Sequence, residues 1–318
     1  MAIDVHAHCV PDGLIDALAR DEARIGVEVP PLAPLLSDLP ARIEAMDRMG
    51  VRRQLISPFI GLTAYQLDPP AGRRYSRLFN ELMTATVHKA PDRLAAFATV
   101  PLQSGWAAAG ELLHAITQLG MVGVEIATAT PNFHLDDKAL APFWEAADDL
   151  GCLILIHPNA AHRGREPYFL GNFVGNPAET TMAVARLMFG GILDDYPRIR
   201  FCLAHGGGFL PYQLGRLERG YAVYDNKKGA RLRSSPRELV SRLYYDTVLH
   251  SPEMIRVLID LVGPEHVLLG SDYPFEMGDL DPLATLAAIP GLSPADQELI
   301  STGNAERLTA DTAPTGSR

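Results

Sequence analysis

The sequence predicts an α/β protein that folds as a (β/α)8 TIM barrel. Short apolar segments rich in Val, Ile, Leu and Phe alternate with longer amphipathic segments along the chain, a pattern typical of repeated βα units around a parallel sheet. The alternation occurs eight times, which suits a barrel, and a doubly wound open sheet is the main alternative. A chain of 318 residues with 47% hydrophobic residues can bury a core of that size.

Eight apolar runs are the expected strands. They cover residues 2–5, 53–57, 95–100, 123–127, 153–156, 200–204, 243–246 and 266–270. Strands of a parallel sheet are buried on both faces, so they form continuous apolar runs in the sequence. The composition of these segments is therefore the one that a barrel wall requires.

Eight amphipathic segments are the expected helices. They cover residues 40–49, 73–88, 106–119, 138–150, 178–189, 210–221, 252–262 and 294–302. Ser251 and Pro252 form a start signal, and Gly50 and Gly120 are stop signals. Residues 1–308 are predicted to form a single barrel domain, and the tail at 309–318 is predicted to be disordered.

Composition argues against several classes of protein. No apolar run approaches the roughly 20 residues of a membrane helix, and no basic and apolar leader opens the chain. Three cysteines without a CxxC pair argue against a disulfide framework and a zinc–thiolate site. A net charge of -10 without a dense basic cluster argues against a nucleic-acid partner. We therefore expect a soluble, cytoplasmic protein, for which a small anionic substrate stays possible.

Five polar side chains stand at the carboxyl ends of expected strands. His6 and His8 follow the first strand, His157 the fifth, His205 the sixth and Asp272 the eighth. These ends converge on one face of a barrel, where active sites are built, so the five residues are expected to meet. The two-residue spacing of His6 and His8 also places both imidazoles on one side of a strand.

The other histidines divide into two groups. His162 and His250 follow the fifth and seventh strands, in loops that could border a pocket. The rest lie in helices, in other loops or at the opposite end of the eighth strand, and they are expected to be structural: His88, His114, His134 and His266.

Three imidazoles and one carboxylate suit a divalent transition metal. Zinc is the first expectation because it takes nitrogen and oxygen ligands and can keep an open position for water, and manganese is the alternative. Water bound to such an ion loses a proton near neutral pH, which yields a nucleophile or a proton source. No organic cofactor is expected.

Several motifs resemble those of the amidohydrolase superfamily, and within it the family that contains 2-amino-3-carboxymuconate 6-semialdehyde decarboxylase. They are DVHAH, LIHP, AHGGG and GSDYPF at four strand ends, RIEAMDRMGV at 42–51, NPAET at 176–180 and GNAERL at 303–308. The resemblance extends to about Leu308. It implies a (β/α)8 barrel of the metal-dependent hydrolase type.

The resemblance also implies roles for individual residues. The ligands of one divalent ion would be His6, His8, His157 and Asp272. His205 would act beside the ion as the general acid and base. Arg216 matches an arginine that reaches the substrate carboxylate across a dimer interface. An arginine fork is a natural bidentate partner for a carboxylate, and a homodimer is therefore expected.

The chain departs from the family between the first strand and the helix expected at 40–49. The named decarboxylase carries there a basic insertion with a second substrate-binding arginine, whereas this chain has RDEARIGVEVPPLAPLLSDLPARIEAMD, which is shorter and Pro-rich. Arg24, in this stretch, matches no motif. The expected substrate is therefore a related carboxylated aromatic or unsaturated acid rather than the namesake semialdehyde.

These observations lead to three functional hypotheses. The first is a metal-dependent, non-oxidative decarboxylase of a small aromatic or unsaturated carboxylic acid, in which metal-bound water and His205 handle the proton. The second is a metal-dependent hydrolase of an amide, lactone or ester, in which His205 protonates the leaving group. The third is a barrel that binds a ligand without turnover, and the presence of all five residues argues against it.

Overall fold

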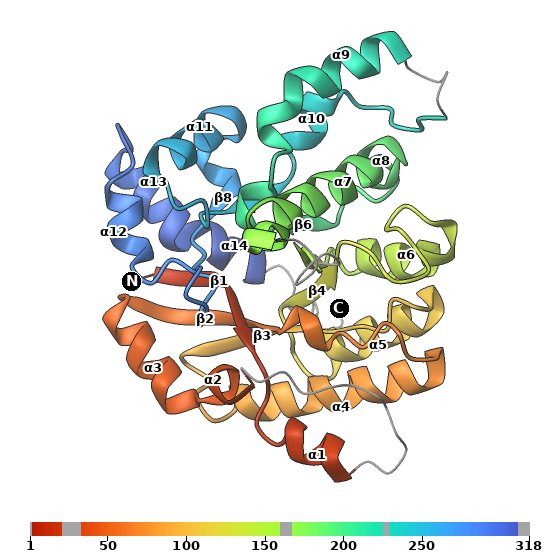
Figure 1. Cartoon of the computed structure of the whole chain (residues 1–318), viewed down its shortest axis with the longest axis vertical. Helices are drawn as coiled ribbons and strands as arrows, with labels where there is room; N and C mark the ends of the chain where they lie inside the picture. Colours follow the sequence, from red (N-terminus) through yellow and green to blue (C-terminus); the bar gives the residue numbers. More distant parts are fainter. Residues whose placement is uncertain (1, 21–32, 160–166, 225–228, 311–318) are drawn as a thin grey trace, which may run out of the picture.

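The computed structural model describes residues 2–20, 33–159, 167–224 and 229–310. Within these residues, eight parallel strands pair in chain order from β1 to β8, and helices surround them (Figure 1). Backbone hydrogen bonds close the sheet on itself, because the N–H groups of Val5 and His8 donate to the carbonyls of Leu269 and Tyr273. Because the sheet closes, the expected barrel is confirmed and the alternative of an open sheet is excluded.

All eight expected strands are present. They are β1 Ala2–Cys9, β2 Val51–Pro58, β3 Leu94–Ala98, β4 Gly123–Ala127, β5 Leu153–His157, β6 Arg200–Leu203, β7 Tyr244–Asp246 and β8 Val267–Leu268. The largest difference from prediction is in β1, which continues through Cys9. His6 and His8 therefore lie within the strand, and the expectation that they follow it was wrong.

The helices alternate with the strands along the chain. They are α1 Leu14–Arg20, α2 Ala33–Ser37, α3 Leu39–Arg48, α4 Pro69–Val87, α5 Gly105–Thr117, α6 Ala141–Asp149, α7 Asn176–Phe189, α8 Ile192–Asp195, α9 Leu214–Tyr224, α10 Pro236–Val240, α11 Pro252–Val262, α12 Pro282–Ala287, α13 Pro294–Glu298 and α14 Asn304–Ala310. The start predicted for α11 is confirmed, since the Ser251 side chain accepts the N–H of Met254. The sequence does not reveal α1, α2, α8, α10 and α12, because each is too short to show a clear period.

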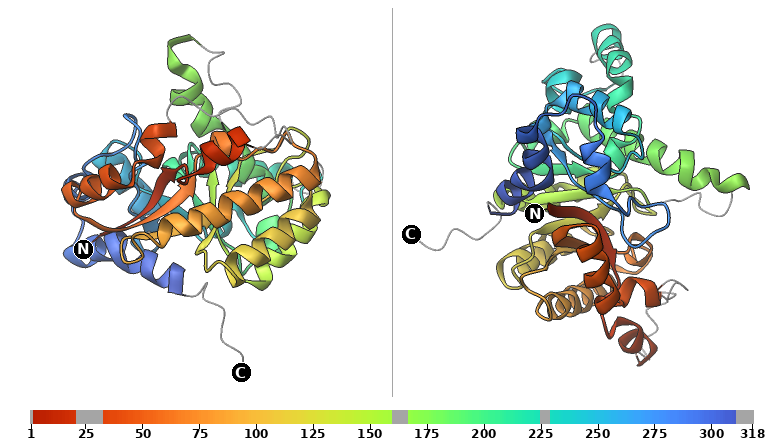
Figure 2. Two further views of the ribbon diagram at one scale, coloured as in Figure 1. Left: turned by 90° about the horizontal axis from the view of Figure 1, so that it is seen from below. Right: turned by 90° about the vertical axis from the view of Figure 1, so that its left-hand side faces the viewer.

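The last expected helix, at 294–302, corresponds to α13 and the π-helical turn that follows it, and the sequence did not predict α14. A π-helical turn at Leu299–Gly303 separates α13 from α14. Helix α14 includes Thr309 and Ala310, which were expected in the tail, and residues 311–318 lie outside the described part of the chain. Ala305 and Leu308 of α14 pack into the interior of the barrel. Figure 2 shows this helix at one end of the barrel and α1 at the opposite end.

An irregularity in β1 turns its histidines toward the interior. Ile3 and Val5 belong to the apolar cluster inside the barrel, whereas Ala7 belongs to the cluster between strands and helices. The register with β2 shifts between Asp4 and Ala7, and a one-residue shift moves each following side chain to the other face of a sheet. His6 and His8 therefore follow Val5 on the inner face, at the mouth of the barrel.

Candidate metal centre

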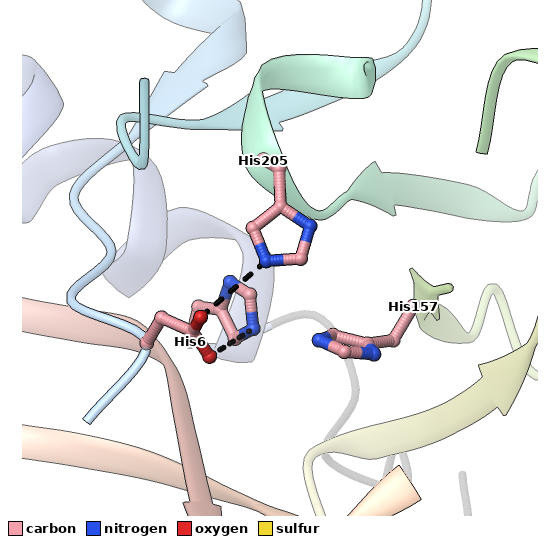
Figure 3. Close-up of side chains that lie close together, drawn as sticks. His6, His157 and His205 are labelled. Atoms are coloured by element: carbon pink, nitrogen blue, oxygen red, sulfur yellow. Dashed lines mark ion pairs between the residues drawn. The ribbon is translucent and has the colours of Figure 1, made fainter. Parts of the chain in front are cut away.

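The five predicted site residues meet at the carboxyl ends of the strands. His6 and His8 extend from β1, and His157 ends β5. His205 begins a 3-10 turn after β6, and Asp272 lies in the loop after β8. The ring centroids of neighbouring histidines are 4.7 to 5.2 Å apart, and Figure 3 shows His6, His157 and His205 around a common space.

Three of the histidines are anchored through Nδ1. The acceptors are Asp246 Oδ2 at 2.6 Å from His6, the Pro58 carbonyl at 3.2 Å from His8, and the Pro158 carbonyl at 2.9 Å from His157. Because a carboxylate or carbonyl oxygen can only accept, each Nδ1 carries the proton. Each Nε2 therefore keeps its lone pair, which is the arrangement found in histidines that bind metals.

The spacing of the free ligand atoms fits the surroundings of one ion. His6 Nε2 and His8 Nε2 are 3.2 Å apart, and Asp272 Oδ1 lies 3.4 and 3.1 Å from them, respectively. Two ligand atoms at bonds of about 2.1 Å lie about 3.0–3.4 Å from each other in octahedral or tetrahedral geometry. His157 Nε2 is buried and has no hydrogen-bond partner among the described atoms. The residues present therefore fit a divalent ion.

The protonation states of His157 and Asp272 suit the binding of a cation. Burial, together with the neighbouring His8 and His205, holds the pKa of His157 well below its ordinary value, so the ring is neutral. Burial would raise the pKa of Asp272, but the adjacent His6 and hydrogen bonding to His205 outweigh it and hold that pKa well below its usual range. A neutral imidazole and an ionised carboxylate are the forms that bind a metal.

Asp246, at the end of β7, connects two parts of the centre. Its carboxylate accepts the Nδ1–H of His6 and the backbone N–H groups of His205 and Gly206, the latter two at 2.9 and 2.8 Å. It therefore fixes the His6 ring and the turn that carries His205. The sequence analysis did not single out Asp246, although it ends an expected strand in the same way as the residues that were chosen.

Asp4 holds the irregular part of β1 to the loop that carries Asp272. Its Oδ1 accepts the N–H groups of His6 and Ser271, both at 3.0 Å, and its Oδ2 accepts the Ser271 hydroxyl and the Gln54 amide. This buried carboxylate was also missed by the sequence analysis. The DVHAH motif contains it, but its partners are only brought together by barrel closure.

His205 differs from the other histidines of the centre. Its Nδ1 has no hydrogen-bond partner among the described atoms, its Nε2 is 3.5 Å from Asp272 Oδ2, and its side chain is 17% exposed whereas those of His6 and His8 are fully buried. Its backbone has a φ of 55°, a strained conformation that tends to persist at functional sites. His205 therefore has a buried ring nitrogen without a partner among the described atoms, at the edge of the centre.

The glycines after His205 allow this turn to pack closely. A Cβ on Gly206 would lie 2.7 Å from the Leu249 side chain, and one on Gly207 would lie 2.8 Å from the Tyr245 ring. Both glycines have positive φ, which other residues rarely adopt. The AHGGG motif thus lets the backbone reach Asp246 without obstruction.

A cavity of about 450 Å³ opens beside the centre. The described residues that line it are His8, Leu35, Phe59, Ile60, His157, Phe169, Asn172, Asn176, His205, Asp272, Phe275, Glu276 and Met277. The rings of Phe59 and Phe275 are 5.9 Å apart, and that of Phe275 is 5.4 Å from His8. The cavity therefore combines apolar aromatic walls with His8, His157, His205 and Asp272 of the centre.

Comparison with known proteins identifies the family. Residues 3–308 match the family model described as Amidohydrolase. This chain belongs to the amidohydrolase family. The 2-amino-3-carboxymuconate-6-semialdehyde decarboxylase of Dictyostelium discoideum is 31% identical over 270 residues, which cover 84% of this chain and 75% of that relative. The family resemblance seen in the sequence is therefore confirmed.

Solved structures show the same fold. The 5-carboxyvanillate decarboxylase of Sphingomonas paucimobilis has a TM-score of 0.86 and 27% identity to this amidohydrolase, covering 97% of this chain and 98% of its own. The 5-carboxyvanillate decarboxylase of Novosphingobium aromaticivorans, solved with manganese and a nitrobenzoic acid, has a TM-score of 0.82 at 20% identity, covering 98% and 96%. These likenesses confirm the (β/α)8 barrel.

The remaining three candidate residues have different outcomes in this amidohydrolase. Arg216 is exposed on α9, beside an apolar groove formed by Phe189, Leu217, Gly220, Tyr221, Tyr224 and Ala230, and it does not line the cavity. His250 borders a smaller cavity of about 100 Å³ that shares His205 and Asp272 with the main one. His162 lies outside the described residues.

His134, which was expected to lie away from the predicted site, is exposed and does not line the cavity beside the centre. It lines a cavity of about 340 Å³ together with residues that directly follow β4, including Thr128. Within the described part of the chain, no helix has the length and apolarity needed to cross a membrane.

Glu125, in the middle of β4, is a buried carboxyl that the sequence analysis missed. It is 1% exposed, neither of its oxygens has a hydrogen-bond partner among the described atoms, and Oε1 lies 4.0 Å from His8 Nδ1. Burial raises its pKa to about 7, against the opposing influence of His8. An acidic residue inside the apolar run GVEIA is the signal that could have found it.

We expect Glu125→Gln to stabilise the metal-free protein at pH 8 more than at pH 5. The pKa rises from 4.5 to about 7 on folding, so between these values the folded state holds a proton that the unfolded chain has lost, and stability falls as the pH rises. Above pH 7, this pKa shift lowers the free energy of unfolding of the wild type by about 3 kcal/mol, which the glutamine variant should regain. Urea unfolding of both proteins at each pH measures this, and an equal effect at both would contradict it.

Proposed function

We propose that this amidohydrolase is a metal-dependent, non-oxidative decarboxylase of a small aromatic carboxylic acid. The observation that carries the proposal is the convergence of three Nε2 lone pairs and one carboxylate beside an aromatic-walled cavity. The names of two relatives give further support. Both are decarboxylases, and the substrate named in one of them, 5-carboxyvanillate, is an aromatic acid.

His6, His8, His157 and Asp272 would hold the ion. A ligand set of three nitrogen atoms and one oxygen suits zinc, and manganese also accepts it; the manganese complex of the Novosphingobium decarboxylase supports the second choice. The bound ion would supply positive charge that binds and polarises the oxygen atoms of the acid. Asp246 would keep the His6 ring oriented toward it.

His205 would supply the proton that the reaction requires. When the bond between the ring carbon and the carboxylate breaks, CO2 leaves and its bonding electrons stay on the ring carbon, which must then take a proton. His205 is the one histidine of the centre whose Nδ1 is without a partner in the described structure, and its ring lines the cavity. The imidazole then regains a proton from solvent.

The aromatic walls would position the ring of the substrate. The rings of Phe59 and Phe275 lie next to each other and to the His8 ring, so a flat acid could pack against them with its carboxylate toward the proposed ion. These walls also exclude water from the carboxylate. Loss of solvation favours CO2 release because the charge becomes dispersed as the bond breaks.

The test of this function is to distinguish CO2 release from hydrolysis. Metal-loaded protein would be incubated with hydroxylated and methoxylated benzoic acids, and separately with aryl esters, amides and lactones. We expect CO2 and the decarboxylated arene in equal amounts, and neither product after chelation of the ion. Hydrolysis of an ester, amide or lactone without CO2 release from any acid would overturn the proposal in favour of a hydrolase.

We further propose a homodimer in which Arg216 of one subunit reaches the substrate of the other. Its exposure, and the apolar groove of about 260 Å³ beside it, support a contact with a second copy. We also propose a cytoplasmic location, which is supported by three buried, unpaired cysteines.

Mixing Arg216→Ala and His205→Ala proteins is expected to restore part of the activity that each variant lacks. In a mixed dimer, one site combines an intact His205 with an intact Arg216, so equal mixing gives roughly a quarter of the wild-type rate when subunits exchange freely. The CO2 assay measures the recovery, and mass spectrometry of the native complex verifies exchange. No recovery despite exchange would show that each site is contained within one subunit.

A further inference from the structure

Asn176, the first residue of α7, has an unsatisfied side-chain oxygen at the substrate cavity. The residue is 4% exposed, and it lines both the main cavity and the smaller one that shares His205 and Asp272. Its Oδ1 is buried and has no hydrogen-bond partner among the described atoms. A buried acceptor without a partner costs about 1–3 kcal/mol, so a partner is expected when the site is in use.

Asn176 shares this property with residues of the centre itself. His157 Nε2 and Asp272 Oδ1 are also buried and unpartnered, and both face the place proposed for the ion. The position of Asn176 is set by its backbone, since its carbonyl accepts the Thr180 hydroxyl at 3.2 Å and Pro177 follows as the next helical residue. Asn176 therefore lines the cavity with a side-chain acceptor that has no partner among the described atoms.

The rest of the cavity limits what this acceptor can meet. The described lining contains neither lysine nor arginine, and much of it is apolar, with Phe59, Ile60 and Phe275 among the walls. A substrate carboxylate would therefore be drawn to the bound ion and to the proposed partner arginine rather than to Asn176, whose oxygen would repel it. An oxygen acceptor in such a place selects a neutral group that donates a hydrogen bond.

We infer that Asn176 accepts a hydrogen bond from a hydroxyl or amino group on the ring of the substrate. The inference rests on the proposed function, because it takes the cavity as the place where an aromatic acid binds. It makes Asn176 a specificity-determining residue that distinguishes ring-hydroxylated or aminated acids from those without a donor at this position. A site that leaves its own polar group unpaired disfavours the analogue that lacks the donor.

The test measures the binding of metal-loaded protein to 2-hydroxybenzoate and to its 2,3-, 2,4-, 2,5- and 2,6-dihydroxy counterparts by calorimetry. One dihydroxy acid is expected to bind wild type about tenfold tighter than 2-hydroxybenzoate. In Asn176→Leu this preference should fall to about onefold, with the ion retained. Asn172→Leu is the matched control, because Asn172 lines the same cavity but is only half-buried, and it should keep the preference.

Each outcome decides between explanations. A preference that persists in Asn176→Leu, or equal weakening of all five acids, would overturn the inference in favour of a structural role. Should the leucine variant fail to fold, Asn176→Ala serves for the same comparison. Failure of every acid to bind wild type would overturn both the inference and the proposed function. Selective binding that depends on Asn176, without CO2 release, would overturn the proposed function alone.

Discussion

Replacement of His6 by alanine is expected to remove the bound ion and the activity together. The variant loses one Nε2 ligand, and it leaves the Asp246 carboxylate buried without its 2.6 Å partner. The remaining ligands are too few to hold the ion against dialysis, so metal content should fall from about one ion per chain to below about 0.1. Elemental analysis after dialysis, paired with the CO2 assay, measures both quantities. Asp272→Ala should give the same result.

A histidine outside the centre provides the control. His88 follows α4 and is exposed, so His88→Ala should keep both the ion and the rate. Full metal content in His6→Ala would contradict the assigned ligand set, even if activity were lost. Circular dichroism of each variant separates ligand loss from unfolding.

His205→Ala is expected to keep the ion and to reduce kcat roughly 100-fold or more, the usual contribution of a positioned acid or base. The reason is that the Nε2 atoms of the three anchored histidines and the Asp272 carboxylate stay in place, whereas the proton donor is removed. KM should change much less than kcat, because the apolar walls of the cavity are unaltered. Steady-state kinetics and elemental analysis of the same preparation test this.

The structure also defines what would refute this role. The ligand atoms of His6, His157, His205 and Asp272 all lie within 4.8 Å of one another, so His205 is close enough to approach an ion. Loss of the ion from His205→Ala would therefore make His205 a ligand rather than the proton donor. Retention of the ion with an unchanged kcat would assign the proton to another group.

The sequence predicted the centre because barrel topology is simple. Once eight strands alternate with helices, their carboxyl ends must converge, and polar residues such as His157 and Asp272 at those ends must meet. Nothing about side-chain contacts was needed for that step. The strands themselves could be predicted because a strand that is buried on both faces forms a continuous apolar run in the sequence.

The residues that support the centre required the folded structure. Asp4 acts through an irregularity in β1 that no periodicity reveals, because the shift appears only in the pairing with β2. Glu125 faces His8 from a strand far away in sequence. Asp246 bonds to a ring from β1 and to the turn after β6. Contacts of this kind join residues that are far apart in the sequence. They form only when the barrel closes, so no local sequence pattern predicts them.

The most direct test of the account is an anomalous-diffraction map of crystals loaded with manganese or zinc. The account predicts one peak per chain, in contact with the Nε2 atoms of His6, His8 and His157 and with the Asp272 carboxylate, while His205 lies outside contact distance. A peak that contacts His205 in place of one of these ligands, or no peak among them, would contradict it.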